Sequence, residues 1–481
     1  MHSLETLRSG GYKDAGLTRL QLTCPLDTFP DEVLELGDTL EELDLSGTGL
    51  SWLPASLGSA LPKLTSVLFS NCNFRSFPRE LASCANLETV AFRDNGMEEI
   101  PEDALPPRLR SLILTNNRLA ALPAAIGRCD QLQECMLAGN QLPDLPLEMA
   151  QCKKLSVLRL SANRLSTLPR WLLALPELAF LSFASNPCCT PPTANGLPTP
   201  RGLVDIPWRD LEIQQTLAST PSTTTSQALW HQSPHYAEDV AVTFFRGTRP
   251  TDAGLAADEL AASLAAGAHE SLVTLLGRVH AHPDEDTASY QGGIATQLLP
   301  PEYTPLASTL VPSSPEPSAS TPQQDHGRLP LPTALELLTG LASALAHLHA
   351  RGIAHGSVSA AENILASRAD AHALLCGFGA ATVYGLSPSR RSAASEDGEG
   401  DEEAGLVEKI EVLAFGRVLE GVLGAVDVQE GEEGVRGLRA LAERCVVPEV
   451  GARPGFGEVV EGLEGLVGWR GMMRIPDVTP R

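Results

Sequence analysis

The sequence predicts a multidomain protein in which an N-terminal α/β solenoid is followed by a C-terminal α+β domain with two lobes. Three observations predict this fold class. A leucine pattern recurs at intervals of 22 to 24 residues from Leu17 onward. After residue 188 the composition turns to proline, glycine and threonine, and beyond residue 208 predicted strands precede predicted helices. Because each repeat of this length forms one supersecondary unit, the first half is expected to stack into one core and the second half to fold separately.

The repeat starts at eight leucines: Leu17, Leu40, Leu64, Leu87, Leu109, Leu132, Leu155 and Leu178. The clearest block, Leu155-x-x-Leu158-x-Leu160-x-x-Asn163-x-Leu165-x-x-Leu168-Pro169, matches the leucine-rich-repeat pattern. In this pattern a short strand points alternate leucines inward and can bury them only by stacking on its neighbours. The Leu-Pro steps of several blocks are expected to begin the return segment behind the strands, at Pro54, Pro123, Pro146 and Pro169.

One position of the repeat is an asparagine in five successive blocks, at Asn95, Asn117, Asn140, Asn163 and Asn186. Its side-chain amide can bond backbone groups that the turn out of the strand leaves unpaired, so a structural ladder is predicted. Thr48 and Cys72 take this position in earlier blocks, as expected for a terminal region.

The strand face between the leucines is the surface that such a domain offers to a partner on its concave side. In the central blocks this face carries polar side chains of both charges. The candidate protein-binding residues are Glu88, Arg93, Asp94, Arg110, Asn116, Gln133, Glu134, Arg159 and Ser161. A face of this size is typically a platform for another protein, although for any single residue a solvated role is the simpler interpretation.

Composition limits the classes of protein to which the chain can belong. With 481 residues, 43% hydrophobic and 20% charged, it is long enough for two or three globular domains. The formal net charge of -24, with 59 acidic against 35 basic residues, argues against a nucleic-acid partner, because phosphate binding needs cations. The N-terminal residues show no signal-peptide pattern and no apolar run is long enough to span a bilayer. We therefore expect a cytoplasmic protein without membrane insertion.

The ten cysteines are expected to be reduced thiols. Cys84, Cys129 and Cys152 each stand three residues before the first leucine of a block, a position typical of a small apolar core residue. The pair Cys188 and Cys189 has no histidine or second cysteine pair at zinc-ligand spacing, so no metal site is expected.

The second half shows strands first and helices afterwards. Strands are predicted at 240–245, 272–282 and 292–299, and helices at 255–267 and 331–352.

Two further stretches look unstructured and are predicted to be disordered insertions. Residues 309–327 are rich in proline and serine, and residues 387–405 end in an acidic run. The expected organisation is a cap at 1–16, about eight repeats at 17–188, a linker at 189–207, a second domain at 208–470 and a tail at 471–481.

Several motifs of the second half, taken in order, resemble those of a protein kinase domain. HLHARGIAHGSVSAAENIL (347–365) resembles the stretch that leads into the kinase catalytic loop. IEVLAFGRVLEGVL (410–423) resembles the start of kinase helix F, and CVVPEVGARPGFGEVVEGL (445–463) resembles the C-terminal R-P-x-F segment. Together with the repeats, the chain resembles the leucine-rich-repeat protein kinase family, as a degenerate, pseudokinase-like member. The resemblance implies a two-lobed protein kinase-like domain over residues 208–470.

The resemblance also assigns the positions of kinase chemistry, and most of the required groups are missing. The glycines of the phosphate loop fall on Ala218, Thr220 and Thr223. The phosphate-binding lysine falls on Thr243, which leaves its expected helix-C partner, Glu259, without a cation; a solvated helix residue is the simpler interpretation of this glutamate.

In the catalytic loop, Gly356 replaces the arginine and Ser357 the catalytic aspartate, while Gly377 replaces the magnesium-binding aspartate of D-F-G. Asn363 stands one residue further from Ser357 than the metal-binding asparagine of the kinase pattern. Either an alanine has been inserted or Glu362 faces the metal position, and the sequence leaves both open.

Residues that carry the kinase frame are kept. His355 and Phe378 are expected to pack inside the domain, Glu411 replaces the helix-F aspartate with another acid, and Arg453 is retained in the last segment.

The sequence thus favours a leucine-rich-repeat pseudokinase that acts as a protein-binding scaffold or signalling regulator. No catalytic residues, cofactor or metal are expected, and the repeats are expected to bind a protein partner. One alternative is an active, divergent serine/threonine kinase that recruits Glu362 or the acids at 396–403 and binds ATP and magnesium. A second alternative is that the repeats carry the whole function and the second domain is a decayed remnant.

Overall fold

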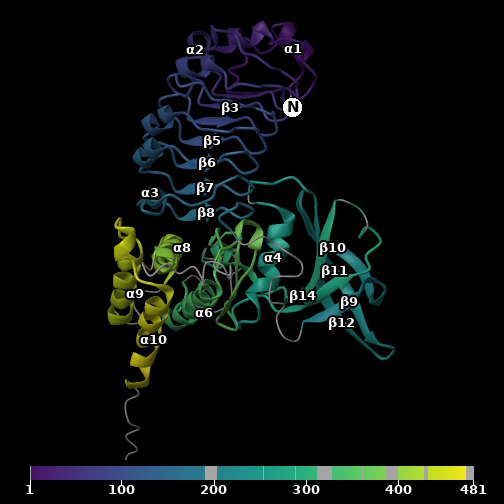
Figure 1. The fold of residues 1–481 in the computed structure, drawn as a ribbon, viewed down its shortest axis with the longest axis vertical. Coiled ribbons are helices and arrows are strands. Elements are labelled where there is room, and N and C mark those ends of the chain that lie inside the picture. Colours follow the sequence, from purple (N-terminus) through teal and green to yellow (C-terminus); the bar gives the residue numbers. More distant parts are fainter. Residues whose placement is uncertain are drawn as a thin grey trace, which may run out of the picture. The chain divides into compact units, whose positions relative to one another are not determined.

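The structure is a computed structural model in which the chain forms two compact units (Figure 1). One unit comprises Met1–Pro191 together with Thr248–Leu255, and the other comprises Pro192–Gly247 together with Ala256–Arg481. The described residues are 2–189, 203–252, 254–285, 287, 289–310, 328–359, 361–384, 399–426 and 432–472. Most of the expected linker (189–207) and of the expected insertions (309–327 and 387–405) therefore lies outside the described residues.

The first unit contains one parallel sheet of eight short strands that lie in sequence order. They are β1 (Arg19–Gln21), β2 (Glu42–Asp44), β3 (Ser66–Leu68), β4 (Thr89–Ala91), β5 (Ser111–Ile113), β6 (Glu134–Met136), β7 (Val157–Arg159) and β8 (Phe180–Ser182). Neighbouring strands pair without a register shift, so the middle residues form one row across the sheet. This row is buried throughout and consists of Leu20, Leu43, Val67, Val90, Leu112, Cys135, Leu158 and Leu181.

Short helical turns connect the strands: α1 (Leu4–Arg8), η1 (Asp31–Leu36), α2 (Leu57–Ala60), η2 (Arg79–Ser83), η3 (Ala124–Arg128), η4 (Leu147–Gln151) and α3 (Arg170–Leu173). Pro123, Pro146 and Pro169 are the N-cap residues of η3, η4 and α3. Proline suits this position because its φ is fixed near -65°, close to the φ that these N-cap residues adopt. The Leu-Pro steps of these three blocks therefore begin the return segments, as predicted.

The asparagine column joins adjacent repeats through buried hydrogen bonds. The Nδ2 of Asn140 donates to the carbonyl oxygens of Leu114 (3.0 Å) and Leu137 (2.9 Å), and its Oδ1 accepts from the amide of Leu119 (3.0 Å). Asn117, Asn163 and Asn186 make the same pattern of bonds in their own blocks. The predicted structural role of this column is confirmed.

Most cysteines of the first unit are core residues, and only Cys24 and Cys189 are partly exposed. Cys84, Cys129 and Cys152 are buried, and burial raises the pKa of each thiol, to about 11 in Cys84 and Cys129 and to about 12 in Cys152. None of the ten cysteines forms a disulfide in the described part of the chain.

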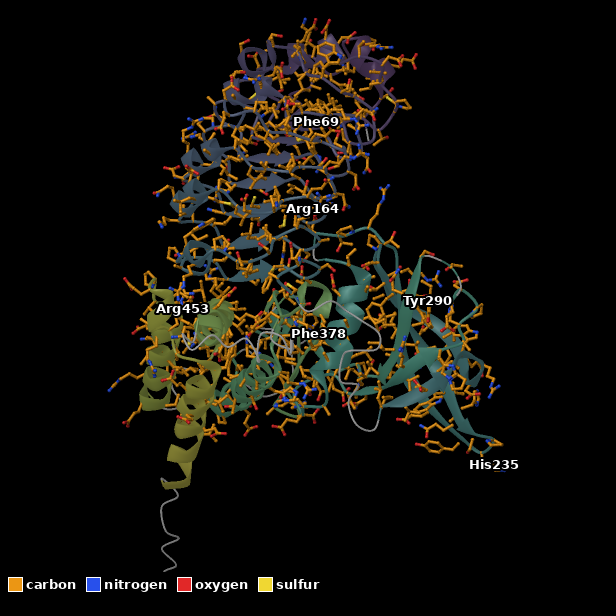
Figure 2. All side chains as sticks on the ribbon, in the orientation of Figure 1. Phe69, Arg164, His235, Tyr290, Phe378 and Arg453 are labelled. Carbon is orange, nitrogen blue, oxygen red and sulfur yellow. The ribbon has the colours of Figure 1, made fainter. Side chains whose placement is uncertain are left out.

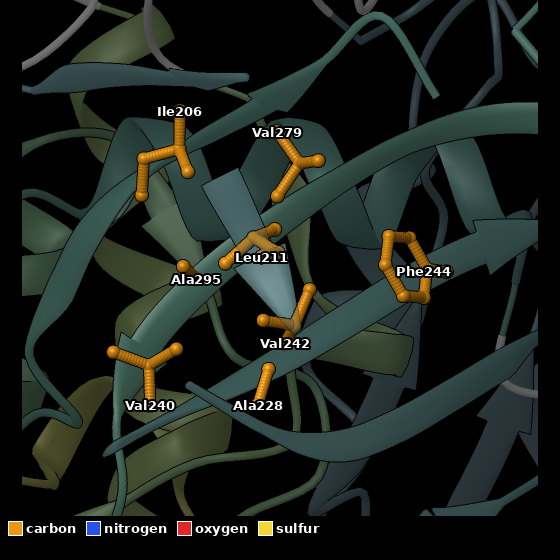
Figure 3. Close-up of a cluster of buried hydrophobic side chains, with 8 residues drawn as sticks. All are labelled: Ile206, Leu211, Ala228, Val240, Val242, Phe244, Val279 and Ala295. Carbon is orange, nitrogen blue, oxygen red and sulfur yellow. The ribbon is translucent and has the colours of Figure 1, made fainter. Parts of the chain in front are cut away.

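The second unit begins with a six-stranded sheet in the order β10-β11-β12-β14-β13-β9. The strands are β9 (Val204–Pro207), β10 (Leu211–Ser219), β11 (Thr223–Ser233), β12 (Tyr236–Arg246), β13 (Leu275–His280) and β14 (Tyr290–Gln297). All neighbours are antiparallel except β9 and β13. A buried cluster on this sheet, centred on Val240, Val242 and Phe244, gathers side chains from β9, β11, β13 and β14 (Figure 3).

The remaining elements of the second unit are mostly helical. They are η5 (Trp208–Asp210), α4 (Ala256–Ala266), β15 (Thr304–Pro305), α5 (Leu306–Leu310), α6 (Leu331–Ala350), β16 (Ile353–Ala354), β17 (Ile364–Ser367), β18 (His372–Leu375), η6 (Phe378–Ala380), β19 (Thr382–Val383), α8 (Glu399–Ala425), α9 (Glu432–Cys445), η7 (Val450–Ala452) and α10 (Phe456–Met472). Helix α6 packs against α8 and α10. Among the described residues it is the one helix long and apolar enough to cross a membrane, but Leu337, Leu338 and Leu345 are fully buried, so packing accounts for its apolar character.

The predicted elements of the second half agree with the observed ones except at the insertions. The strands expected at 240–245, 272–282 and 292–299 correspond to β12, β13 and β14, and the helices expected at 255–267 and 331–352 to α4 and α6. The prediction of disorder is wrong at 399–405, because α8 already begins at Glu399, and at 309–310, which end α5. Acidic residues such as Glu402 and Glu403 are favourable near a helix N-terminus, where the helix dipole is positive. The assignment of a leucine-rich-repeat solenoid and of two kinase lobes to these sheets and helices stays a prediction.

Replacing the ladder asparagine Asn140 with alanine should destabilise the first unit strongly. Asn140→Ala removes three buried hydrogen bonds and leaves the Leu119 amide without its partner, while the carbonyls of Leu114 and Leu137 keep their bonds from Asn117 and Asn163. At about 1 kcal/mol for each lost bond, we expect a cost of about 3 kcal/mol of unfolding free energy. Asn86→Ala is the matched control, since Asn86 is exposed: it donates to the Pro62 carbonyl and accepts from Arg108 at the surface, so its cost should stay below about 1 kcal/mol. Urea unfolding followed by circular dichroism measures both, and equal losses would contradict a structural ladder.

Candidate functional site

The loop that follows β16 and resembles a catalytic loop contacts the segment that follows β18 through the side chain of His355. His355 is fully buried, and its Nε2–H donates to the carbonyl oxygen of Cys376 at 3.0 Å. Its ring lies 5.3 Å from the ring of Phe378, which Figure 2 labels at the start of η6. The two residues that the resemblance assigns to the kinase frame are thus in contact, and their contact sets the path of the loop.

A buried carboxylate from α8 holds the same loop from the other side. Glu411 accepts hydrogen bonds from the backbone amide of Gly356 and from Nε2 of His349 on α6, the latter at 2.8 Å. Burial by itself raises the pKa of Glu411, but these hydrogen bonds and the nearby histidines outweigh it and hold the pKa below its ordinary value. Nδ1 of His349 lies 3.0 Å from the Tyr384 hydroxyl, so this network also reaches the residue after β19.

The positions that the resemblance assigns to magnesium binding are closed by an amide. The Nδ2 of Asn363 donates to the carbonyl oxygen of Ser357 at 2.7 Å. Gly377 has a left-handed backbone (φ 76°), and a Cβ placed on it would overlap the amide oxygen of Asn363 and stand 2.9 Å from its Cγ. A side chain at residue 377 would therefore require the Asn363 amide to move, and it would be strained by the left-handed backbone.

The structure shows where the two residues left as alternatives by the sequence, Asn363 and Glu362, lie. Asn363 points its amide toward Gly377, whereas Glu362 is exposed on the preceding turn. Asn363 therefore lies beside Gly377, and the assignment of a metal-side position to either residue stays a prediction. Within the described ranges, no group of three or more His, Cys, Asp or Glu side chains could hold a metal ion.

The strand position assigned to the kinase lysine is occupied by a satisfied hydroxyl. Thr243 lies in the middle of β12, between Thr225 on β11 and Ile294 on β14. The Oγ1 atoms of Thr243 and Thr225 lie 2.9 Å apart, within hydrogen-bond distance. The cross-strand pair stabilises the sheet and supplies no positive charge for a phosphate.

Glu259 on α4 is not the solvated residue that the simpler interpretation expects. It is half-buried, and burial raises the pKa of its carboxyl to about 7. Among the described residues, no lysine, arginine or histidine forms an ion pair of 4.0 Å or less with it. The correction has a physical reason: α4 packs against β12, β14 and η6, so one side of the helix is withdrawn from water.

The candidate glycine loop is the tight turn between β10 and β11. Ala218 and Thr223 lie at the strand ends, and Thr220 lies in the turn, where its Oγ1 accepts hydrogen bonds from the amides of Ser222 and Thr223. A threonine hydroxyl thus binds the turn amides that could otherwise face an anion. The amides of this turn are hydrogen-bonded within the turn, which contains no glycine.

In the first unit, several predicted binding residues bond one another along the strands. Arg110 lies 3.4 Å from both Glu88 and Gln133, and Ser111 donates to Glu134 at 3.0 Å. These pairs are exposed or half-buried, so each contributes little free energy. Arg159 ends β7 and is half-buried.

The expectation that Ser161 faces solvent is wrong, because Ser161 is fully buried. Its position is two residues before a ladder asparagine, where the neighbouring blocks also carry small buried side chains. These are Thr115, Ala138 and Ala184.

Three predicted residues, Arg93, Asp94 and Asn116, meet a segment that the sequence did not place there. Thr248–Leu255 belongs to the first unit, and its Asp252 accepts hydrogen bonds from Arg93 and from Thr115. Sequence reasoning missed Thr115, because it looked like one more strand residue. The signal available was its position two residues before a ladder asparagine, which Arg93 also holds in the preceding block.

A comparison with models of known protein families finds no match to the chain.

We predict that titration of Glu259 makes the second unit less stable as pH rises. Its pKa is about 7 in the folded chain and about 4.3 in an unfolded one, so the folded state binds this proton more tightly. The stabilisation is present in full below pH about 4 and is lost as pH rises through 7. Glu259→Gln removes this dependence, so between pH 4.5 and 8 the wild type should lose on the order of 2 kcal/mol relative to the variant.

Urea unfolding at several pH values measures this difference. Glu362→Gln is the matched control, because it makes the same change of charge at an exposed glutamate and should leave the pH dependence of the wild type unaltered. Parallel pH profiles for the wild type and Glu259→Gln would contradict the prediction.

Proposed function

We propose that the protein is a cytoplasmic leucine-rich-repeat pseudokinase that serves as a protein-binding scaffold or signalling regulator. In this proposal the repeats of the first unit bind a protein partner, and the second unit has the frame of a protein kinase without its phosphate chemistry. The proposal rests on the resemblance of the motifs together with the geometry of the residues that those motifs assign.

The observation that carries the proposal is the closed arrangement of Ser357, Asn363 and Gly377. Phosphoryl transfer by a kinase depends on one aspartate carboxylate that accepts the proton of the substrate hydroxyl and on another that binds magnesium. Here a serine, an amide and a glycine take these positions, and the amide is bonded to the backbone of the serine residue. Because such catalysis depends chiefly on electrostatic stabilisation of the transition state, the loss of both acids removes several orders of magnitude in rate.

Two further observations support the same conclusion. At the positions assigned to the kinase lysine–glutamate pair, Thr243 supplies only a neutral hydroxyl, and Glu259 is a carboxyl whose pKa is raised. At the same time His355 and Glu411, which hold the loop in place, are buried and bonded. The positions assigned to phosphate binding thus lack the required charges, whereas the residues that hold the loop in place are present.

Phosphotransfer by the purified full-length chain tests the proposal. With radiolabelled ATP and either magnesium or manganese, we expect no autophosphorylation above that of a boiled sample, because no group remains to hold the metal or accept the proton. Casein can be added as a general acceptor. Incorporation that is lost in Glu362→Gln or Asn363→Ala would overturn the proposal and favour a divergent active kinase.

A further inference from the structure

The segment Thr248–Leu255 places a carboxylate between two donors on the sheet of the first unit. One carboxylate oxygen of Asp252 accepts from an Nη2–H of Arg93, and the other accepts from the hydroxyl of Thr115. Thr115 is fully buried, and the side chains of Arg93 and Asp252 are about two-thirds withdrawn from solvent, with 39% and 34% exposed. A charge-assisted, partly desolvated contact of this kind is stronger than an exposed ion pair.

The residues before Asp252 are held mainly through the backbone. The Nδ2 of Asn116 donates to the carbonyl oxygen of Pro250 at 2.8 Å. Arg249 lies 3.7 Å from Asp94, but its side chain is 84% exposed, so this ion pair adds little. The proline and the aspartate are therefore the main anchors, and the arginine is a minor one.

The pyrrolidine ring of Pro250 packs closely against the backbone of Gly139. Gly139 has a left-handed backbone (φ 71°), and a Cβ placed on it would stand 2.9 Å from Cγ of Pro250. Asp94 and Asn116, one position before their ladder asparagines, also have positive φ (56° and 59°), a conformation that Asp and Asn tolerate better than most residues. The turns after β4, β5 and β6 thus present a carboxylate, an amide and a bare backbone in a row.

We propose that Arg93, Thr115, Asn116 and Gly139 form a peptide-binding site on the first unit, which recognises an extended partner segment of the type Pro-x-Asp. The proposal rests on the scaffold function above and names the chemistry of its partner. Thr248–Leu255 then acts as an internal pseudo-ligand that occupies the site in the isolated chain. The same contacts define both roles: a proline seated on Gly139, a carbonyl bonded to Asn116, and an aspartate bonded to Arg93 and Thr115.

An internal ligand competes with an external one through its effective concentration. A tethered segment experiences a local concentration on the order of millimolar, so a partner segment of similar intrinsic affinity binds only weakly until the internal one is displaced. Partner binding would therefore be weakened by the internal segment and strengthened by any change that removes its anchor. The site would give the scaffold a closed and an open form.

The test uses the full-length chain and a fluorescein-labelled peptide of residues 246–257, RGTRPTDAGLAA, whose binding is followed by fluorescence anisotropy. Asp252→Ala in the protein removes the main anchor of the internal segment but leaves the site intact. We expect this variant to bind the peptide about tenfold more tightly than the wild type. In the Asp252→Ala background, Arg93→Ala should then weaken binding by at least about tenfold.

Arg108→Ala in the same background is the matched control, because Arg108 also belongs to the first unit, is exposed, and bonds only Asn86 among the contacts described for it. It should bind the peptide as tightly as Asp252→Ala alone, and a peptide with asparagine in place of the aspartate should bind more weakly. Melting temperatures of all variants establish that they are folded. Equal peptide affinity for the wild type and Asp252→Ala, or no loss on adding Arg93→Ala, would overturn the inference.

The outcome of this test is separate from that of the proposed function. Phosphotransfer by the wild-type chain would overturn the pseudokinase proposal without changing the peptide affinities. Equal peptide affinities would overturn the Pro-x-Asp site while leaving a scaffold that binds its partner elsewhere on the first unit.

Discussion

The buried carboxylate of Glu411 is the interaction on which the organisation of the second unit depends. From α8 it accepts a hydrogen bond from the Gly356 amide, at the head of the loop, and another from His349 on α6. A buried charge is tolerated only when it is fully bonded, so this carboxylate fixes the two helices and the loop relative to one another. His355 extends the same frame to Cys376 and Phe378. The loop is therefore well held, although the groups it presents are a serine and an amide rather than two acids.

Much of the local architecture could be predicted from the sequence because its cause is periodic. A leucine block of 22 to 24 residues requires one inward row per strand, and the ladder from Asn95 to Asn186 follows from the need to bond the backbone at each turn. The prolines at 123, 146 and 169 mark helix starts for an equally local reason. The uncharged residues Thr243, Ser357 and Gly377 can be read from the sequence alone, whereas their assignment to kinase positions rests on the resemblance of the motifs.

What could not be predicted depends on contacts between residues distant in sequence. The burial of Glu259 follows from the packing of α4 on two strands and on η6, and no local pattern reveals it. The choice between Asn363 and Glu362 depends on which side chain turns toward Gly377. The seating of Asp252 on Arg93 and Thr115 joins residues more than 130 positions apart. The start of α8 at Glu399 was missed because an acidic run suits a disordered segment and a helix N-terminus equally well.

The central proposal is that a kinase-like frame persists here without a site for nucleotide and metal, and a calorimetric titration of the full-length chain with ATP and magnesium tests it most directly. We predict no saturable heat up to about 1 mM nucleotide, since no lysine or carboxylate remains at the assigned positions to hold the phosphates or the metal. Saturable binding with a dissociation constant below about 100 μM, abolished by Asn363→Ala, would contradict it.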